Sequence, residues 1–241
     1  MVILVAKQSI DTSDLGKVKG KWKNGTGSVK AKKDGKLWYK ITDIQAPTEK
    51  KFKKIINDPD KLFKGADTIT GSDFGDTLLA YGGDDVVKAG GGADIVEGGA
   101  GNDQLFGGGD DDRMSGGDGA DLLSGGAGDN LLTGNGGKDS FLFDAPLKPG
   151  NQSRITDFEP GVDTIQLDRS VFKDIGGKGK LPADSLFLYP DPSKVIPEHS
   201  VIYDKDNGEI WYTENGSIID AVLFAKVTSG IELSHKDFLI V

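Results

Sequence analysis

The sequence predicts an all-β fold: a right-handed parallel β-roll (a β-solenoid) with an N-terminal β/α cap and a C-terminal β-rich cap. Two observations predict it. A nine-residue period runs from Gly65 to Phe143 without insertion or deletion, and the flanking segments are short apolar runs separated by turn residues. We therefore expect three parts: a basic cap over 1–64, the roll over 65–143 and a C-terminal cap over 144–241.

Each nine-residue repeat carries an acidic residue, or in one case asparagine, with an apolar side chain two places later. The acidic position is Asp67, Asp76, Asp85, Asp94, Asp103, Asp112, Asp121, Asn130 and Asp139. The apolar position is Ile69, Leu78, Val87, Val96, Leu105, Met114, Leu123, Leu132 and Phe141. A flexible glycine-rich linker would not keep an apolar residue in phase, so the period indicates a stacked solenoid with a continuous core.

Glycines precede most of the acidic residues, and they suit tight turns that expose carbonyl oxygens. A short strand follows each turn, and two repeats make one coil. Coils stack at about 4.8 Å, so aspartates eighteen residues apart would be near neighbours. Their repulsion costs on the order of 1 kcal/mol per pair in water and more when desolvated. A Ca²⁺ ion, which takes about 6 to 8 oxygen ligands, would remove it, and metal binding and folding would be one event.

The eighteen-residue coil places the acidic residues on two edges of the roll. One edge carries Asp67, Asp85, Asp103, Asp121 and Asp139, and the other carries Asp76, Asp94, Asp112 and Asn130. Five turns leave four gaps and four turns leave three, so we expect seven candidate sites. An eighth is suggested by Asp157, eighteen residues after Asp139.

The repeats GGAGNDQLF, from Gly98, and GGDGADLLS, from Gly116, match the nonapeptide G-G-x-G-x-D-x-U-x. On these residues the chain resembles the hemolysin-type (RTX) calcium-binding repeat proteins of bacteria. The resemblance implies how each ion is held. One turn supplies its second and fourth carbonyls and its aspartate, and the next turn on that edge supplies its first and third carbonyls and its aspartate.

Carried over to the first edge, the resemblance implies five sites. They join Phe63, Gly65 and Asp67 to Ala80, Gly82 and Asp85; Tyr81, Gly83 and Asp85 to Gly98, Ala100 and Asp103; Gly99, Gly101 and Asp103 to Gly116, Asp118 and Asp121; Gly117, Gly119 and Asp121 to Gly134, Gly136 and Asp139; and Asn135, Gly137 and Asp139 to Asp157. On the second edge they join Asp76 to Ala89, Gly91 and Asp94; Gly90, Gly92 and Asp94 to Gly107, Gly109 and Asp112; and Gly108, Asp110 and Asp112 to Gly125, Ala127 and Asn130.

Several positions depart from the family's pattern. Phe74 and Asp110 replace the fourth glycine, Ala80 and Ala89 replace the first, and Asn130 lacks a charge. We expect the edge from Asp103 to Asp139 to bind calcium best, and the sites that use Phe74 or Asn130 to be weak or empty.

Charge divides the chain more sharply than length does. Residues 1–64 carry 16 lysines against 7 acids, residues 65–143 carry 3 basic residues against 15 acids, and the whole chain has a net charge of −9. The lysine excess has two interpretations: a solvated surface that offsets the acidic roll, or a patch for an anionic polysaccharide or the cell envelope. Nucleic acid is disfavoured by the negative total charge and by the lack of arginine in the basic segment.

The N-terminal segment predicts strands over Val2–Ala6, Ser28–Lys32 and Leu37–Ile41, the last two joined by an Asp34-Gly35 turn. Helical spacing then follows over 47–57, and we expect this helix to cap the first coil. There is no cysteine, no apolar run as long as a membrane span of about 18 residues, and no N-terminal signal peptide.

The C-terminal segment predicts strands over Arg154–Phe158, Asp163–Leu167, Val201–Tyr203 and Glu209–Thr213, the last two joined by an Asn207-Gly208 hairpin turn. DKDNGE lacks the twelfth-place glutamate of an EF-hand, so we expect a turn. FLFDAP, RITDFEPGVDTIQLDRSVF and the terminal HKDFLIV are similar to the C-terminal region of RTX proteins exported by type I secretion machinery. The resemblance implies an uncleaved secretion signal at the end of the chain; a final β-strand is the alternative and is compatible with it.

Catalytic groups are scarce: the chain has two histidines, no HExxH motif, no cysteine and no G-x-S-x-G elbow. We expect a secreted, extracellular or cell-surface protein that is not an enzyme, folds on binding several Ca²⁺ ions after type I secretion, and serves adhesion or contact with the envelope or a polysaccharide. Two alternatives are the folding and secretion module of a larger protease, lipase or epimerase, and a host-interacting effector. Met1 and an N-terminal cap favour a whole protein over such a module.

Overall fold

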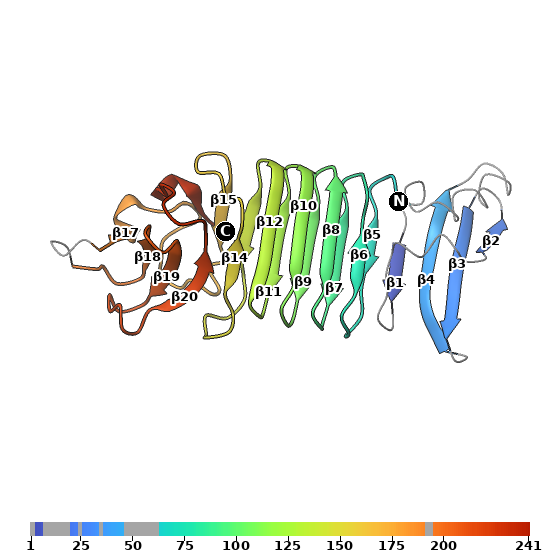
Figure 1. Ribbon diagram of the computed structural model, residues 1–241, viewed down its shortest axis with the longest axis horizontal. Coiled ribbons are helices and arrows are strands. Elements are labelled where there is room, and N and C mark those ends of the chain that lie inside the picture. The colour runs from blue at the N-terminus through green and yellow to red at the C-terminus, as the bar shows by residue number, and fades with distance from the viewer. Residues whose placement is uncertain (1–2, 7–19, 24–25, 34–35, 46–62, 191–194) are drawn as a thin grey trace.

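The computed structural model describes residues 63–190 and 195–241 in full. It also describes the backbone of four N-terminal strands, β1 (Ile3–Ala6), β2 (Gly20–Lys23), β3 (Thr26–Lys33) and β4 (Lys36–Gln45). These ranges contain no α-helix, and an elongated stack of strands forms the middle of the molecule (Figure 1). None of their helical segments is long and apolar enough to cross a membrane.

Each repeat forms one strand, and successive strands alternate between two sheets. The first sheet takes β5 (Thr68–Thr70), β7 (Val86–Gly90), β9 (Gln104–Gly108), β11 (Leu122–Gly126) and β13 (Ser140–Phe143). The second takes β6 (Thr77–Leu79), β8 (Ile95–Ala100), β10 (Arg113–Gly119) and β12 (Asn130–Gly137). Neighbouring strands run parallel, with Thr68 facing Val86 and Val86 facing Gln104. Two repeats therefore make one coil, and the predicted parallel β-roll is confirmed.

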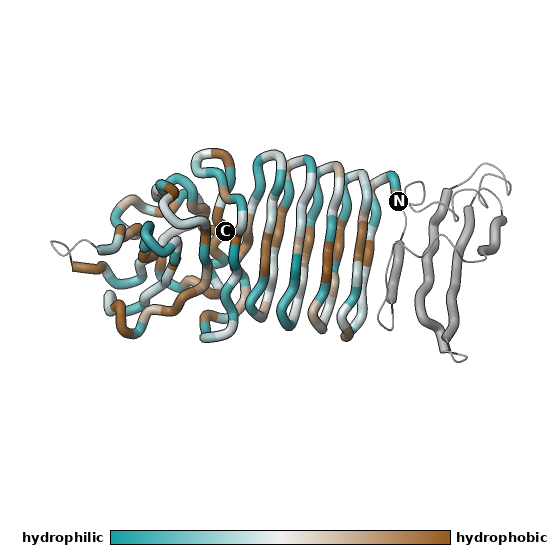
Figure 2. The backbone as a smooth tube through the Cα atoms, viewed as in Figure 1, coloured by the Kyte–Doolittle hydropathy of each residue, from teal (hydrophilic) through white to brown (hydrophobic). Residues whose placement is uncertain are grey.

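The core of the roll is a column of apolar side chains between the two sheets. All nine apolar repeat positions are buried; Leu105 and Leu123, for example, are fully so. Gln104, one residue before Leu105, is exposed, as the alternation of side chains along a strand requires. Apolar residues recur at similar positions in successive coils (Figure 2). The period thus aligns one core residue with the next.

Both sheets continue past residue 143. β14 (Ser153–Ile155) and β15 (Thr164–Leu167) pair in parallel with β12 and β13, and β20 (Val222–Lys226) and β21 (Phe238–Ile240) then pair with β14 and β15. Edge-to-face ring contacts among Phe143, Phe172 and Phe224 lie beneath these strands. The remaining elements are β16 (Gly179–Lys180), β17 (Leu186–Tyr189) and two 3₁₀ turns, η2 (Ala183–Ser185) and η3 (His235–Asp237).

The hairpin predicted at Asn207-Gly208 is confirmed. β18 (Ser200–Asp204) and β19 (Glu209–Thr213) are antiparallel, with Asp204 facing Glu209. The Asp204 carboxylate accepts the backbone N–H groups of Asp206 and Asn207. This segment is therefore a hydrogen-bonded turn, as expected, and not an EF-hand loop.

The N-terminal strands extend the first sheet. β1 pairs in parallel with β5 and antiparallel with β4, and β3 and β2 follow β4. Strands thus lie at the three places where the sequence predicts them. The predicted helix over 47–57 and the Asp34-Gly35 turn lie outside the described residues.

Candidate metal centre

The turns between strands have the backbone conformation that the repeat pattern predicts. From the repeat of Asp85 onward, the second and fourth places of each turn have positive φ. Three of these places hold other residues than glycine: Tyr81 and Asp110 at φ 71° and Asn135 at φ 67°. Gly119 shows why glycine dominates, because a Cβ there would lie 1.9 Å from the Gly101 carbonyl oxygen of the coil before.

The repeat aspartates form a hydrogen-bonded ladder along each edge. One carboxylate oxygen of each, Oδ1, accepts the backbone N–H of the repeat aspartate one coil earlier. The Asp85 N–H donates to Asp103 at 2.8 Å, and the Asp103 N–H donates to Asp121 at 2.8 Å. The Asp94 N–H likewise donates to Asp112 at 2.9 Å on the other edge. Each ladder therefore holds its carboxylates in one row.

The second oxygen of the interior aspartates, Oδ2, has no partner. It is buried and accepts no hydrogen bond at five positions, whose residues are at most 2% exposed: Asp85, Asp94, Asp103, Asp112 and Asp121. Burying an unpaired carboxylate oxygen is costly unless a proton or a cation neutralises it. The five orphaned oxygens therefore indicate where the fold needs positive charge.

Backbone carbonyls converge on these oxygens. A Cβ at Gly98 would lie 2.3 Å from Asp103 Oδ2 and 2.6 Å from the carbonyl oxygen of Gly116, one coil later. The same arrangement recurs with Asp112 and Gly125 around Gly107, and with Asp121 and Gly134 around Gly116. The space left by the first-place glycine is thus lined by a carboxylate and a carbonyl oxygen, which fits a hard divalent cation. The structure brings Asp103 and Gly116 together, as the sequence predicts for one site.

Carbonyl oxygens must supply most of each coordination shell. No cluster of three or more acidic or histidine side chains suited to a metal occurs among the described residues. An arrangement with two carboxylates for each ion and backbone oxygens for the rest contains no such cluster. Two first-place residues are alanines, Ala80 and Ala89, and their side chains are fully buried. Their methyl groups leave less room for an ion than glycine does. This supports the expectation that these two turns depart from the family's pattern.

Burial raises the pKa of the ladder carboxyls. Desolvation raises the pKa of Asp85 to about 8 and that of Asp112 to about 7, and neighbouring aspartates add to both shifts. The pKa values of Asp94, Asp121 and Asp139 rise to about 6 for the same main reason. Without a cation, the folded roll therefore favours a protonated Asp85 at neutral pH, and it favours protonated carboxyls at all five positions only below pH about 6.

At two ends of the ladders, hydrogen-bond donors reach the second carboxylate oxygen instead. At the start of the second edge, the N–H and hydroxyl of Ser72 donate to Asp76 Oδ2 at 2.7 and 3.0 Å. At the end of the first edge, the Glu159 N–H donates to Asp163 Oδ2 at 2.9 Å. The Ser72 turn also lacks the positive φ of the later turns, and Phe74 is exposed. These contacts support the expectation that the site at the Phe74 turn is weak or empty.

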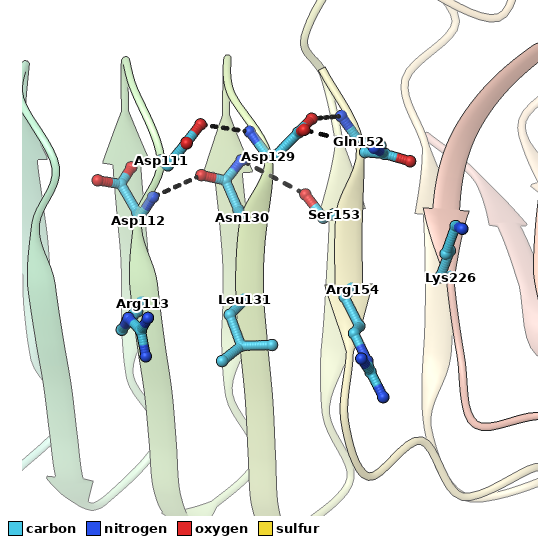
Figure 3. Close-up of a pocket in the computed structure, with 10 residues that line it drawn as sticks. All are labelled: Asp111, Asp112, Arg113, Asp129, Asn130, Leu131, Gln152, Ser153, Arg154 and Lys226. Carbon is cyan, nitrogen blue, oxygen red and sulfur yellow. Dashed lines mark hydrogen bonds between the residues drawn. The ribbon is translucent and has the colours of Figure 1, made fainter. Parts of the chain in front are cut away.

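Asn130 replaces the orphaned oxygen with an amide donor. Its Oδ1 accepts the Asp112 N–H, as the aspartates do, but its Nδ2 donates to Ser153 (Figure 3). The Nδ2 also donates to the carbonyls of Gly126 and Gly128. These two carbonyls belong to the second and fourth places of its own turn. The amide protons therefore stand where a cation bound by these two carbonyls would lie. The expected weak site is a different one, because it joins Asp112 to Gly125, Ala127 and Asn130, and its weakness stays a prediction.

The place of Asp157 in the ladder was predicted wrongly. The residue one coil after Asp139 is Asp163, whose Oδ1 accepts the Asp139 N–H at 3.0 Å. Asp157 instead accepts the N–H groups of Gly134 and Asn135. The last coil is 24 residues long rather than 18, because the segment after Phe143 loops out before β14. Counting by eighteen therefore missed Asp163. The available signal was the DTIQL motif that begins at Asp163 and resembles the repeats.

Comparison with known proteins agrees with this geometry. The family described as the RTX calcium-binding nonapeptide repeat (4 copies) matches residues 63–96, 88–123 and 115–145. These residues are RTX calcium-binding repeats. RTX nonapeptide repeats bind Ca²⁺, so Ca²⁺ is the cofactor of this roll.

One solved structure to which the chain is similar is the AlgE6R3 subunit from the Azotobacter vinelandii mannuronan C5-epimerase. It is 24% identical, with 73% of this chain and 78% of that chain covered and a TM-score of 0.32. None of the curated proteins matches this sequence significantly.

The raised pKa values predict opposite pH dependences with and without calcium. In chelator, proton binding stabilises the folded RTX roll, and this stabilisation is lost as the pH rises through about 6 to 8. We expect the metal-free protein to resist urea better at pH 6 than at pH 8.5. In saturating calcium, protons compete with the ion, so we expect resistance to be greater at pH 8.5. Equal pH dependence in both conditions would contradict proton and cation competing for the same oxygens.

Asn130→Asp should create a calcium requirement at its turn. The substitution places a second carboxylate oxygen opposite the carbonyls of Gly126 and Gly128, where the amide now donates. We expect about one more calcium bound per chain and lower stability in chelator, because the repulsion then needs a cation. Equilibrium dialysis with elemental analysis measures the first and urea unfolding the second. An unchanged calcium count with unchanged stability would show that the amide does not stand in for a cation.

Proposed function

We propose that this RTX protein is an extracellular calcium-gated binding protein whose roll closes only where calcium is plentiful. The observation that carries the proposal is the row of five buried aspartates with an unpartnered second oxygen. Extracellular calcium modules commonly have dissociation constants of about 10⁻⁴ to 10⁻³ M. At that affinity the roll stays open at cytosolic calcium and folds outside the cell.

We propose the ions lie between successive turns of each edge, bound by the carbonyls and aspartates that the family pattern implies. The best-supported site lies between the turns of Asp103 and Asp121, where the carboxylate of Asp103 and the carbonyl of Gly116 face one space. The turns at Ser72 and Asn130 carry their own donors and contribute little to binding. Calcium loading is therefore concentrated in the middle of the roll.

We propose that export precedes folding, and the burial of β21 supports this order. β21 pairs with β15 and β16, and Phe238 and Ile240 are fully buried or nearly so. A secretion signal at this end is accessible to type I machinery only while the roll is open. Low cytosolic calcium would keep the roll open and the signal exposed, and calcium outside the cell would then incorporate the signal into the sheet.

We propose a binding role rather than a catalytic one. The periodic carboxylates are accounted for by cations, and the chain has only two histidines and no cysteine to serve as other catalytic groups. The folded surfaces then serve adhesion or contact with an envelope polysaccharide.

Asp103→Asn tests the calcium gate directly. The change keeps the size of the side chain but removes the charge at a buried, unpartnered oxygen. We expect at least one calcium fewer per chain and a calcium midpoint for folding roughly tenfold higher, about 1.4 kcal/mol at that step. Asp73→Asn makes the same chemical change at an exposed residue and should alter neither quantity. Equal effects of the two variants would overturn the proposal.

Removal of residues 237–241 tests the export route. In a bacterium that carries a type I exporter, we expect the full chain in the medium and the shortened chain in the cells. The matched control is Ile219→Ser, which changes a 90% exposed side chain of the same region and should be exported normally. Equal export of the shortened chain, measured by immunoblot of cells and medium, would place the signal elsewhere.

A further inference from the structure

A groove of about 450 Å³ lies on the outer face of the second sheet, where the roll meets the C-terminal strands (Figure 3). One row of its lining crosses four consecutive strands: Arg113 on β10, Leu131 on β12, Arg154 on β14 and Lys226 on β20. Neighbouring strands are spaced by about 4.8 Å. The three cations therefore lie in a line, with Arg113 about two strand spacings from Arg154 and Lys226 one spacing further on.

The two arginines of this row have no anionic partner in the described part of the chain. Lys226 forms an ion pair with Glu209 at 2.8 Å, whereas no such pair or hydrogen bond joins Arg113 or Arg154 to a described residue. Both side chains are exposed, on a protein whose net charge is −9 and whose repeats carry only 3 basic residues. Unpaired guanidinium groups on such an acidic surface are available for an external anion.

Hydrogen-bond acceptors form the opposite side of the groove. Asp111 and Asp129 are exposed there, and the Asp129 carboxylate accepts from the backbone and side chain of Gln152. These groups would repel a densely charged polyanion such as nucleic acid. They would accept hydrogen bonds from the hydroxyl groups of a ligand whose anionic groups are widely spaced.

We propose that this groove binds an acidic oligosaccharide through its carboxylate groups. Arg113 and Arg154 would each hold a carboxylate by paired N–H donors, and the sugar hydroxyls would donate to the exposed carboxylates of Asp111 and Asp129. A linear chain of sugar acids meets both requirements, since each unit carries one carboxylate and several hydroxyls. The inference deepens the proposed binding function and rests on it, because the groove spans strands that exist only in the folded roll.

The test is binding of tetragalacturonate to the full chain in saturating calcium at low ionic strength, measured by calorimetry. We expect binding that weakens as salt rises. Carboxyl-reduced tetragalacturonate, which keeps the hydroxyls, should not bind. The double variant Arg113→Ala/Arg154→Ala should lose about 10- to 100-fold in affinity. Arg169→Ala removes one exposed arginine outside the groove and should bind as the original chain does.

Circular dichroism and bound calcium are measured on every variant, so that the failures can be told apart. A chain that folds with calcium but does not bind tetragalacturonate would overturn the groove assignment and leave the calcium gate intact. Equal affinity of the double variant and the original chain would also overturn it, because the saccharide would then bind elsewhere. A chain that takes up no calcium and is folded in chelator would contradict the proposed function itself.

Discussion

The structure depends on how the second oxygen of each interior aspartate is neutralised. Oδ1 belongs to the β-ladder, since it accepts the N–H of the aspartate one coil before, as Asp103 does for Asp85. Oδ2 is buried beside a carbonyl of the next coil and has no donor. The same side chain therefore holds two coils together through Oδ1 and opposes their stacking through its unneutralised Oδ2. A proton or Ca²⁺ can resolve this conflict, and the RTX repeats use Ca²⁺. Once the cation is bound, burial of the apolar column at Leu105 and its equivalents stabilises the stacked coils.

Three turns at the ends of the roll resolve the same conflict with hydrogen-bond donors. Ser72 donates to Asp76, the Asn130 amide donates to carbonyls of its own turn, and Glu159 donates to Asp163. The second edge is therefore bounded at both ends by turns that carry their own donors, and the first edge is bounded in this way at its C-terminal end. Next to the Asn130 turn, the arginine row of β10 and β14 provides positive charge on the outer face of an acidic molecule. The calcium-binding turns and the proposed ligand groove therefore lie in adjacent parts of the second sheet.

Much of this was predictable from the nonapeptide period. The period identifies the strands, the core position and the two edges, because every repeat from Asp67 to Asp139 has the same length. It fails where the length changes: the loop after Phe143 moves the next ladder residue from Asp157 to Asp163. The Ser72 donors could not be predicted, since they depend on local turn geometry. The pairing of Arg154 with Lys226 joins residues 72 apart, and no repeat relates their positions.

The most direct measurement is a calcium titration of the chelated full chain at pH 7.5, with circular dichroism and bound calcium followed together. The account predicts a cooperative change from a coil-like spectrum to a β spectrum, with several ions bound per chain at the end point. A β spectrum already complete in excess chelator, with no calcium taken up afterwards, would contradict it. The buried carboxylates would then be neutralised by other means, and the repeats would be a scaffold rather than a gate.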